Sequence, residues 1–192
     1  MISSSINLAF GSKVYIESLF AFTKNMVERD VVLKEKVKFV GYGDFKNLYS
    51  YAFDWIKGEN YTIIEDLYTE KVKGNAKDLE IVWKASKEIT DYFKIELDFK
   101  WRIFGMEDVE VEVDGKKKKM NKFVELGIEI KGTLAKDFAN QWNTSGATRF
   151  FKEIYNKYVI PGRTVQMKER VEKDVQDFKE EMKALLELTG KK

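Results

Sequence analysis

The sequence predicts an α+β fold: an antiparallel meander sheet of five to six strands, with one face solvated and the other covered by helices. Apolar residues recur at helical spacing towards both ends of the chain, whereas between about residues 60 and 130 their period is two. The 192 residues, 44% of them hydrophobic, are enough for one sizeable core. We therefore expect an N-terminal arm or helix at residues 1–30 and a single α+β domain at residues 31–192.

The first elements follow from periodicity and capping. The apolar pattern from Lys13 to about Arg29 predicts an amphipathic helix, and the alternation over Val32–Tyr42 predicts a strand. Asp44 occupies a position typical of an N-cap, so the apolar stripe after it predicts a helix at about 44–58. Together with a long C-terminal helix, these helices are expected to cover one face of the sheet.

The meander begins after Gly58. Tyr61–Val72 reads as a strand that turns at Gly74-Asn75 towards a second strand, which contains Leu79 and Ala85. Apolar and charged residues alternate without error over Phe93–Ile103, which predicts a strand with one buried and one wet face.

The alternation continues through Val109–Val113 to Asp114-Gly115, a dipeptide that favours a tight hairpin turn. Val124–Ile130 supplies the return strand, in which Gly127 predicts a possible bulge.

Helical spacing returns near the C-terminus. Phe150–Tyr158 predicts a short helix that ends near Pro161, the only proline. Thr164 is predicted to cap the last helix, which ends at Gly190. Its apolar stripe has spacings of four, three, four and three, formed by Val171, Val175, Phe178, Met182 and Leu185.

Two resemblances bear on this reading. From about residue 37 to 189 the chain resembles a family of small uncharacterised archaeal proteins, a likeness that implies no activity and transfers no functional residue. The likeness is carried by Asp44, Trp55, Asn60-Tyr61, Trp83, Asp91-Tyr92-Phe93, Trp101, Val109–Lys118 and Ile154-Tyr155. The element order is also similar to the helix-grip (START-like) ligand-binding fold, although that family usually has a second helix after its first strand.

The Lys- and Glu-rich, Cys-free composition is typical of thermophile proteins.

Composition argues against most catalytic chemistry. The chain has no histidine and no cysteine, which excludes Ser-His-Asp and Cys-His catalysis and the common zinc sites. No nucleotide-binding loop is present. We expect no enzyme activity, no cofactor and no metal, while carboxylate-only catalysis stays open.

No apolar run is long enough to span a membrane and no secretory signal pattern is visible, so a cytoplasmic protein is expected.

The sequence offers three sets of candidate site residues. A basic cluster on the predicted hairpin, which would contact phosphates, consists of Lys116, Lys117, Lys118, Lys119 and Lys122. The carboxylate pairs Glu96/Asp98 and Glu110/Glu112 lie on single strand faces, where solvated ion pairs are the simpler reading. Large aromatic side chains that would line a cavity for a small hydrophobic ligand, or simply fill the core, are Trp83, Phe99 and Trp101.

The formal net charge of +2, from 34 basic and 32 acidic residues, gives no global attraction to nucleic acid, and no arginine or aromatic residue interleaves the lysines. We expect a non-enzymatic structural or interaction protein that associates with itself, as a homo-oligomer, or with another protein through its terminal helices. The alternatives are a carrier of a hydrophobic ligand in a helix-grip-like cavity and weak binding of nucleic acid or another anionic polymer.

Overall fold

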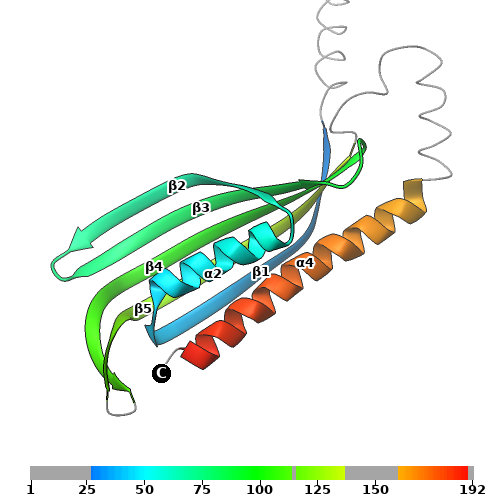
Figure 1. The fold of residues 1–192 in the computed structure, drawn as a ribbon. Helices are drawn as coiled ribbons and strands as arrows, with labels where there is room; N and C mark the ends of the chain where they lie inside the picture. The colour runs from blue at the N-terminus through cyan, green and yellow to red at the C-terminus, as the bar shows by residue number, and fades with distance from the viewer. Residues whose placement is uncertain (1–26, 114–115, 137–159, 190–192) are drawn as a thin grey trace, which may run out of the picture.

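The computed structural model describes residues 27–113, 116–136 and 160–189. They form one five-stranded antiparallel sheet and two helices, which confirms the predicted α+β class (Figure 1). The elements in chain order are β1 (Glu28–Gly43), α2 (Phe45–Gly58), β2 (Thr62–Lys73), β3 (Ala76–Glu88), β4 (Phe93–Val113), β5 (Lys116–Lys136) and α4 (Ile160–Thr189).

The sheet order is β1-β5-β4-β3-β2. Strands β2 to β5 form the predicted meander, in which each strand pairs with the next along the chain. The first strand, β1, pairs instead with the last, β5. Because of this long-range pairing, β1 and β2 occupy the two edges of the sheet, although only α2 separates them along the chain.

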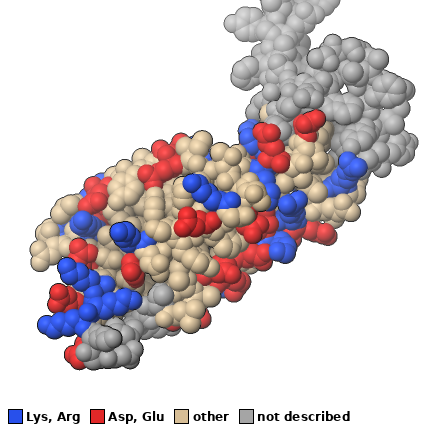
Figure 2. Space-filling view, viewed as in Figure 1, with Lys and Arg blue, Asp and Glu red and all other residues tan. Residues whose placement is uncertain are grey.

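Both helices lie on one face of the sheet (Figure 1), and the core lies between them and the strands. The strict alternation in β4 places Ile95, Leu97, Phe99, Trp101 and Ile103 in this core, each with no exposed surface. The alternate residues of the sheet form an outer face rich in charged side chains, and charges of both signs also intermingle on the side of the molecule shown in Figure 2.

Helix α2 begins as the sequence predicts. The Asp44 carboxylate accepts a hydrogen bond from the backbone N–H of Asn47 at 3.0 Å, the N-cap interaction that satisfies a free donor of the first turn. The helix buries Leu48, Ala52 and Ile56 against the sheet. The chain then leaves it through a left-handed residue, Asn60, with a φ of 62°.

The apolar stripe of helix α4 packs against the sheet of the same chain. Val171, Val175, Phe178 and Met182 have no exposed surface and belong to the common core. On the same side, the buried Tyr61 hydroxyl donates a 2.5 Å hydrogen bond to the carboxylate of Asp174. This part of the predicted C-terminal stripe is therefore covered by the sheet.

Two local predictions differ from the structure. Thr164 does not cap α4, because the helix already begins at Ile160; Pro161 fits its first turn, where no helical N–H bond is lost. Gly127 forms no bulge, since its pairing with both neighbouring strands is continuous. The register shifts lie instead between β1 and β5, on β2 between Glu65 and Leu67, and between β3 and β4.

Some predicted segments lie outside the described residues: most of the helix at 13–29, the turn at 114–115 and the short helix at 150–158. The last residues of the first of these belong to β1, which begins at Glu28. Within the described residues, the sheet face is thus covered by α2 and α4.

Ion pairs hold α4 against β1. Lys168 lies 2.9 Å from the carboxylate of Asp30, and Lys179 lies 3.1 Å from that of Glu35, which also accepts a hydrogen bond from Gln176. The hydrogen bond from Lys168 to Asp30, reinforced by Lys136, lowers the pKa of Asp30. The hydrogen bond from Lys179, reinforced by Gln176, lowers the pKa of Glu35.

We expect Glu35→Gln to flatten the acid limb of the stability profile. Carboxylates with lowered pKa values in the folded state contribute stability above their unfolded values of about 4, and this contribution is lost as the pH falls through the folded pKa. Urea unfolding between about pH 6 and pH 3 should show a smaller decline for Glu35→Gln than for wild type. Glu172→Gln, at an exposed position of α4, should retain the wild-type decline. Equal slopes for all three proteins would contradict a role for this ion pair.

Candidate interaction surface

Strand β2 is a free edge of the sheet. Among the described residues, the only strand that pairs with it is β3. In Figure 1, β2 borders the sheet on the side away from α4. An edge strand of this kind presents a row of unpaired N–H and C=O groups to which a further strand can bond. At twelve residues β2 is also long for an edge, since short edge strands are one of the usual protections.

The opposite edge is covered differently. Strand β1 packs against α4, and the ion pairs of Asp30 and Glu35 fasten it to that helix. It also carries the exposed lysines Lys34, Lys36 and Lys38, charges that discourage pairing with another strand. The two edges are therefore unlike: the exposed valines of β1, Val31 and Val40, flank a run of lysines on a strand fastened to α4, whereas β2 exposes four large apolar side chains.

Four large apolar side chains of β2 are exposed. The exposed fractions are 63% for Ile64, 41% for Leu67, 50% for Tyr68 and 65% for Val72. The register shift between Glu65 and Leu67 places Ile64 and Leu67 on the outer face and Tyr68 and Val72 on the face that the helices occupy. A strand added here would meet apolar side chains on both of its faces.

Charge is divided along β2. Acidic side chains come first, at Glu65, Asp66 and Glu70, and basic ones follow at Lys71 and Lys73. Exposed ion pairs tie three of these residues to β3: Asp66 to Lys84 at 2.8 Å, Glu70 to Lys77 at 3.1 Å and Lys73 to Asp78 at 2.6 Å. They contribute little stability individually, but they orient the charges along the edge.

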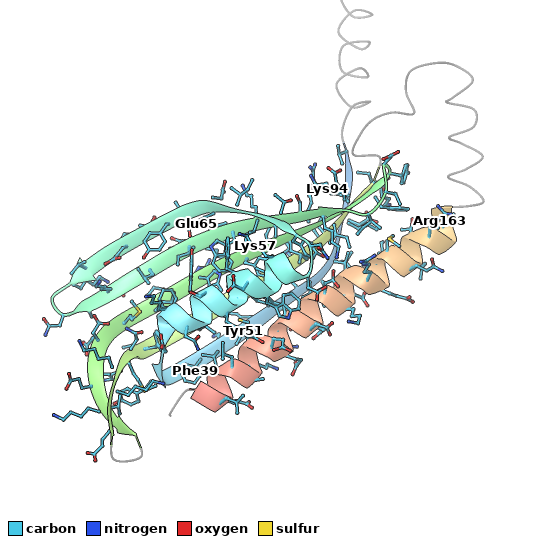
Figure 3. The ribbon with its side chains drawn as sticks, in the orientation of Figure 1. Phe39, Tyr51, Lys57, Glu65, Lys94 and Arg163 are labelled. Carbon is cyan, nitrogen blue, oxygen red and sulfur yellow. The ribbon has the colours of Figure 1, made fainter. Side chains whose placement is uncertain are left out.

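A polar cluster anchors β2 to α2. The Tyr49 hydroxyl donates a hydrogen bond to the Glu65 carboxylate, and the indole N–H of Trp83 lies 3.3 Å from the Tyr49 oxygen and 3.4 Å from that of Glu65. Glu65 extends from β2 on the side of α2 (Figure 3). Burial, together with the hydrogen bond to Glu65, raises the pKa of Tyr49 to about 12. The cluster holds β2 against α2.

The outer sheet face carries a shallow groove of about 640 Å³ over β1, β5 and β4. Its charges are mostly neutralised: Lys36 pairs with Glu129 at 2.8 Å and Lys131 with Asp98 at 2.6 Å. The neighbouring carboxylate of the predicted pair, Glu96, lies 2.8 Å from Arg29. No group of three or more metal-ligating side chains occurs in the part of the chain that the structure describes.

The predicted lysine cluster lies at the start of β5. Three of its members are directly opposite glutamates on β4, in the pairs Lys117 with Glu112, Lys119 with Glu110 and Lys122 with Glu107. In the strand register, Lys116 and Lys118 are paired with valines instead. Basic side chains gather beside this end of the hairpin in Figure 2, with carboxylates among them. Anion binding at this place stays a prediction.

The three aromatic residues of the predicted cavity come together in the core. Trp83, Phe99 and Trp101 have no exposed surface, and the Trp83 ring centroid lies 5.1 Å from that of Trp101 and 6.4 Å from that of Phe99. They are packed against one another, and none of them lines the groove on the outer sheet face. The Trp101 indole N–H has no acceptor among the described residues. A ligand cavity here stays a prediction.

Comparison with known proteins supplies no family. No protein-family model matches the chain, and no curated protein matches it in sequence. None of the described helices is both long enough and apolar enough to cross a membrane. The function must therefore be inferred from the surface itself, and the free edge of β2, which sequence reasoning recognised only as a strand, is its most distinctive part.

Proposed function

We propose that this protein is a non-enzymatic structural or interaction protein that self-associates by extending its sheet at β2. The observation that carries the proposal is the free edge of β2 together with the exposure of Ile64, Leu67, Tyr68 and Val72 along it. Strand addition satisfies the unpaired backbone groups and removes apolar surface from water in one step.

This surface differs from the terminal helices that the sequence suggested. In α4, the buried stripe from Val171 to Met182 already packs against its own sheet and is not free to dock elsewhere. The N-terminal arm, at residues 1–26, lies outside the described residues. Among the described elements, β2 offers the largest apolar side chains on an edge with no pairing partner.

We expect Ile64→Lys/Val72→Lys to weaken self-association at least about tenfold, since two apolar contacts are replaced by charges that repel the partner. Light scattering over a concentration series would report the change. The matched control is Val40→Lys/Val124→Lys: these two valines are 60% and 63% exposed, but lie away from β2. The control should associate like wild type.

Three outcomes would contradict the proposal. One is a wild-type protein that stays monomeric at every concentration, and another is an Ile64/Val72 variant with unchanged mass. The third is association that survives the Ile64/Val72 changes but is lost on removal of residues 1–26, which would place the contact on the N-terminal arm.

A further inference from the structure

Resting on the proposed function, the geometry points to one partner for β2: we infer that it pairs with β2 of a second copy, antiparallel and across a two-fold axis. The two five-stranded sheets would then form one continuous sheet with the two β2 strands at its centre. The other strand arrangements, parallel self-pairing and pairing with a strand of a different protein, are distinguished below.

The charge division along β2 selects the antiparallel arrangement. A two-fold axis across the strand places the acidic segment of one copy, Glu65 to Glu70, beside the basic segment of the other, Lys71 and Lys73, and repeats that contact by symmetry. Parallel pairing would instead set like charges side by side. Opposite charges on facing strands stabilise a pair, whereas like charges destabilise it.

The apolar side chains suit a self-complementary contact as well. Ile64 and Leu67 lie on the outer face, and Tyr68 and Val72 lie on the face of the helices. In a two-fold pair each copy contributes the same set, so both faces of the new strand pair gain apolar neighbours. The cost of ordering is small, because β2 is already held by β3 and by the bond from Tyr49 to Glu65.

Nothing in the described part of the chain competes for this edge. Helix α2 reaches β2 at Glu65, on the helix face, while the pairing groups on the far side of the strand have no partner strand. No rearrangement of the described elements is needed for a second copy to add its own β2.

Charge reversal tests the arrangement directly. In one variant, Asp66→Lys/Glu70→Lys, the edge becomes mainly basic; in the other, Lys71→Glu/Lys73→Glu, it becomes wholly acidic. All four positions are exposed, and Glu65 is left unchanged because it anchors β2 to α2. Each variant alone should associate at least about tenfold more weakly than wild type, since like charges then meet across the axis. An equimolar mixture should form a heterodimer, visible by native mass spectrometry.

A second measurement reads the distance between the strands in place of the effect of charge reversal. The chain has no cysteine, so a single Thr69→Cys or Lys73→Cys carries a unique spin label. In antiparallel pairing the distance between equivalent labels grows by about 7 Å for each residue away from the axis, because strands rise about 3.4 Å per residue in opposite directions. The axis that sets the acidic segment beside the basic one lies near Thr69, so the label distance should be clearly longer at position 73 than at position 69. Parallel pairing would give similar short distances at both.

The outcomes separate this inference from the proposed function. The first possible outcome is that Ile64→Lys/Val72→Lys abolishes self-association, while the charge variants form no heterodimer and the two label distances are equal. Antiparallel pairing is then overturned, and strand addition at β2 stands. Binding of the wild-type protein to a different polypeptide through β2, with no self-association, would overturn both the antiparallel self-pairing and the self-association of the proposed function. If the Ile64/Val72 changes leave every association unchanged, both proposals fall together.

Discussion

Replacing Phe178 by alanine is expected to lower the free energy of unfolding by about 3–5 kcal/mol, the usual cost of removing a buried aromatic ring. Phe178 has no exposed surface and lies midway along the buried stripe of α4. Its ring centroid is 4.7 Å from that of Phe99 on β4 and 5.4 Å from that of Trp55 on α2. The side chain thus joins both helices to the sheet, and its loss leaves a cavity where the three elements meet.

The matched control for this change is Val165→Ala on the same helix, where the side chain is 55% exposed. Urea unfolding followed by circular dichroism should show a change of at most about 0.5 kcal/mol for the control. A loss of less than about 1 kcal/mol for Phe178→Ala would show that α4 does not pack on the sheet as described.

Gly132→Ala is expected to lower the free energy of unfolding by about 1–3 kcal/mol, the range for overpacking a filled core. A Cβ at this position of β5 would lie 2.6 Å from Cγ1 of Val171 and 2.8 Å from Cγ2 of Val175. Both are branched side chains on α4 that have few alternative rotamers in a helix. The helix would have to move away from the sheet, so the glycine sets how closely the two can approach.

Gly127→Ala is the control on the same strand, where a Cβ would meet its nearest neighbours, Arg102 O and Lys36 Cε, at 3.7 Å, an ordinary contact. It should be neutral or slightly stabilising. Combining Gly132→Ala with Val171→Ala should recover part of the loss relative to the sum of the two single changes, because the added methyl then fills the space that was vacated. Strict additivity of the two changes would argue against the close approach.

Local patterns predicted most of the secondary structure because each pattern depends on neighbouring residues. The alternation over Phe93–Ile103 identified both the strand and its buried face, and the aspartate at position 44 identified the start of α2. The stripe from Val171 to Met182 likewise identified the buried face of α4. In each case, one side of a regular element requires burial, and the period reveals which side it is.

Positions that depend on their neighbours in space were predicted less well. A glycine in a strand, such as Gly127, is compatible with a bulge or with an ordinary paired residue, and only the facing strands decide between them. Thr164 has the chemistry of a cap, but the helix continues through it to Ile160, and its hydroxyl has no partner among the described residues. Capping chemistry marks possible starts of a helix without choosing one.

The candidate surface shows the same division. By itself the sequence determined the fold class, the strand at β2 and the exposed and buried faces of most elements, because these follow from composition and period. Only the tertiary structure decided that β1 pairs with β5, about ninety positions away in the chain, and thereby that β2 is left at the edge. The pairing of distant strands is chosen by the packing of the whole core, a sum over many contacts that no local pattern contains.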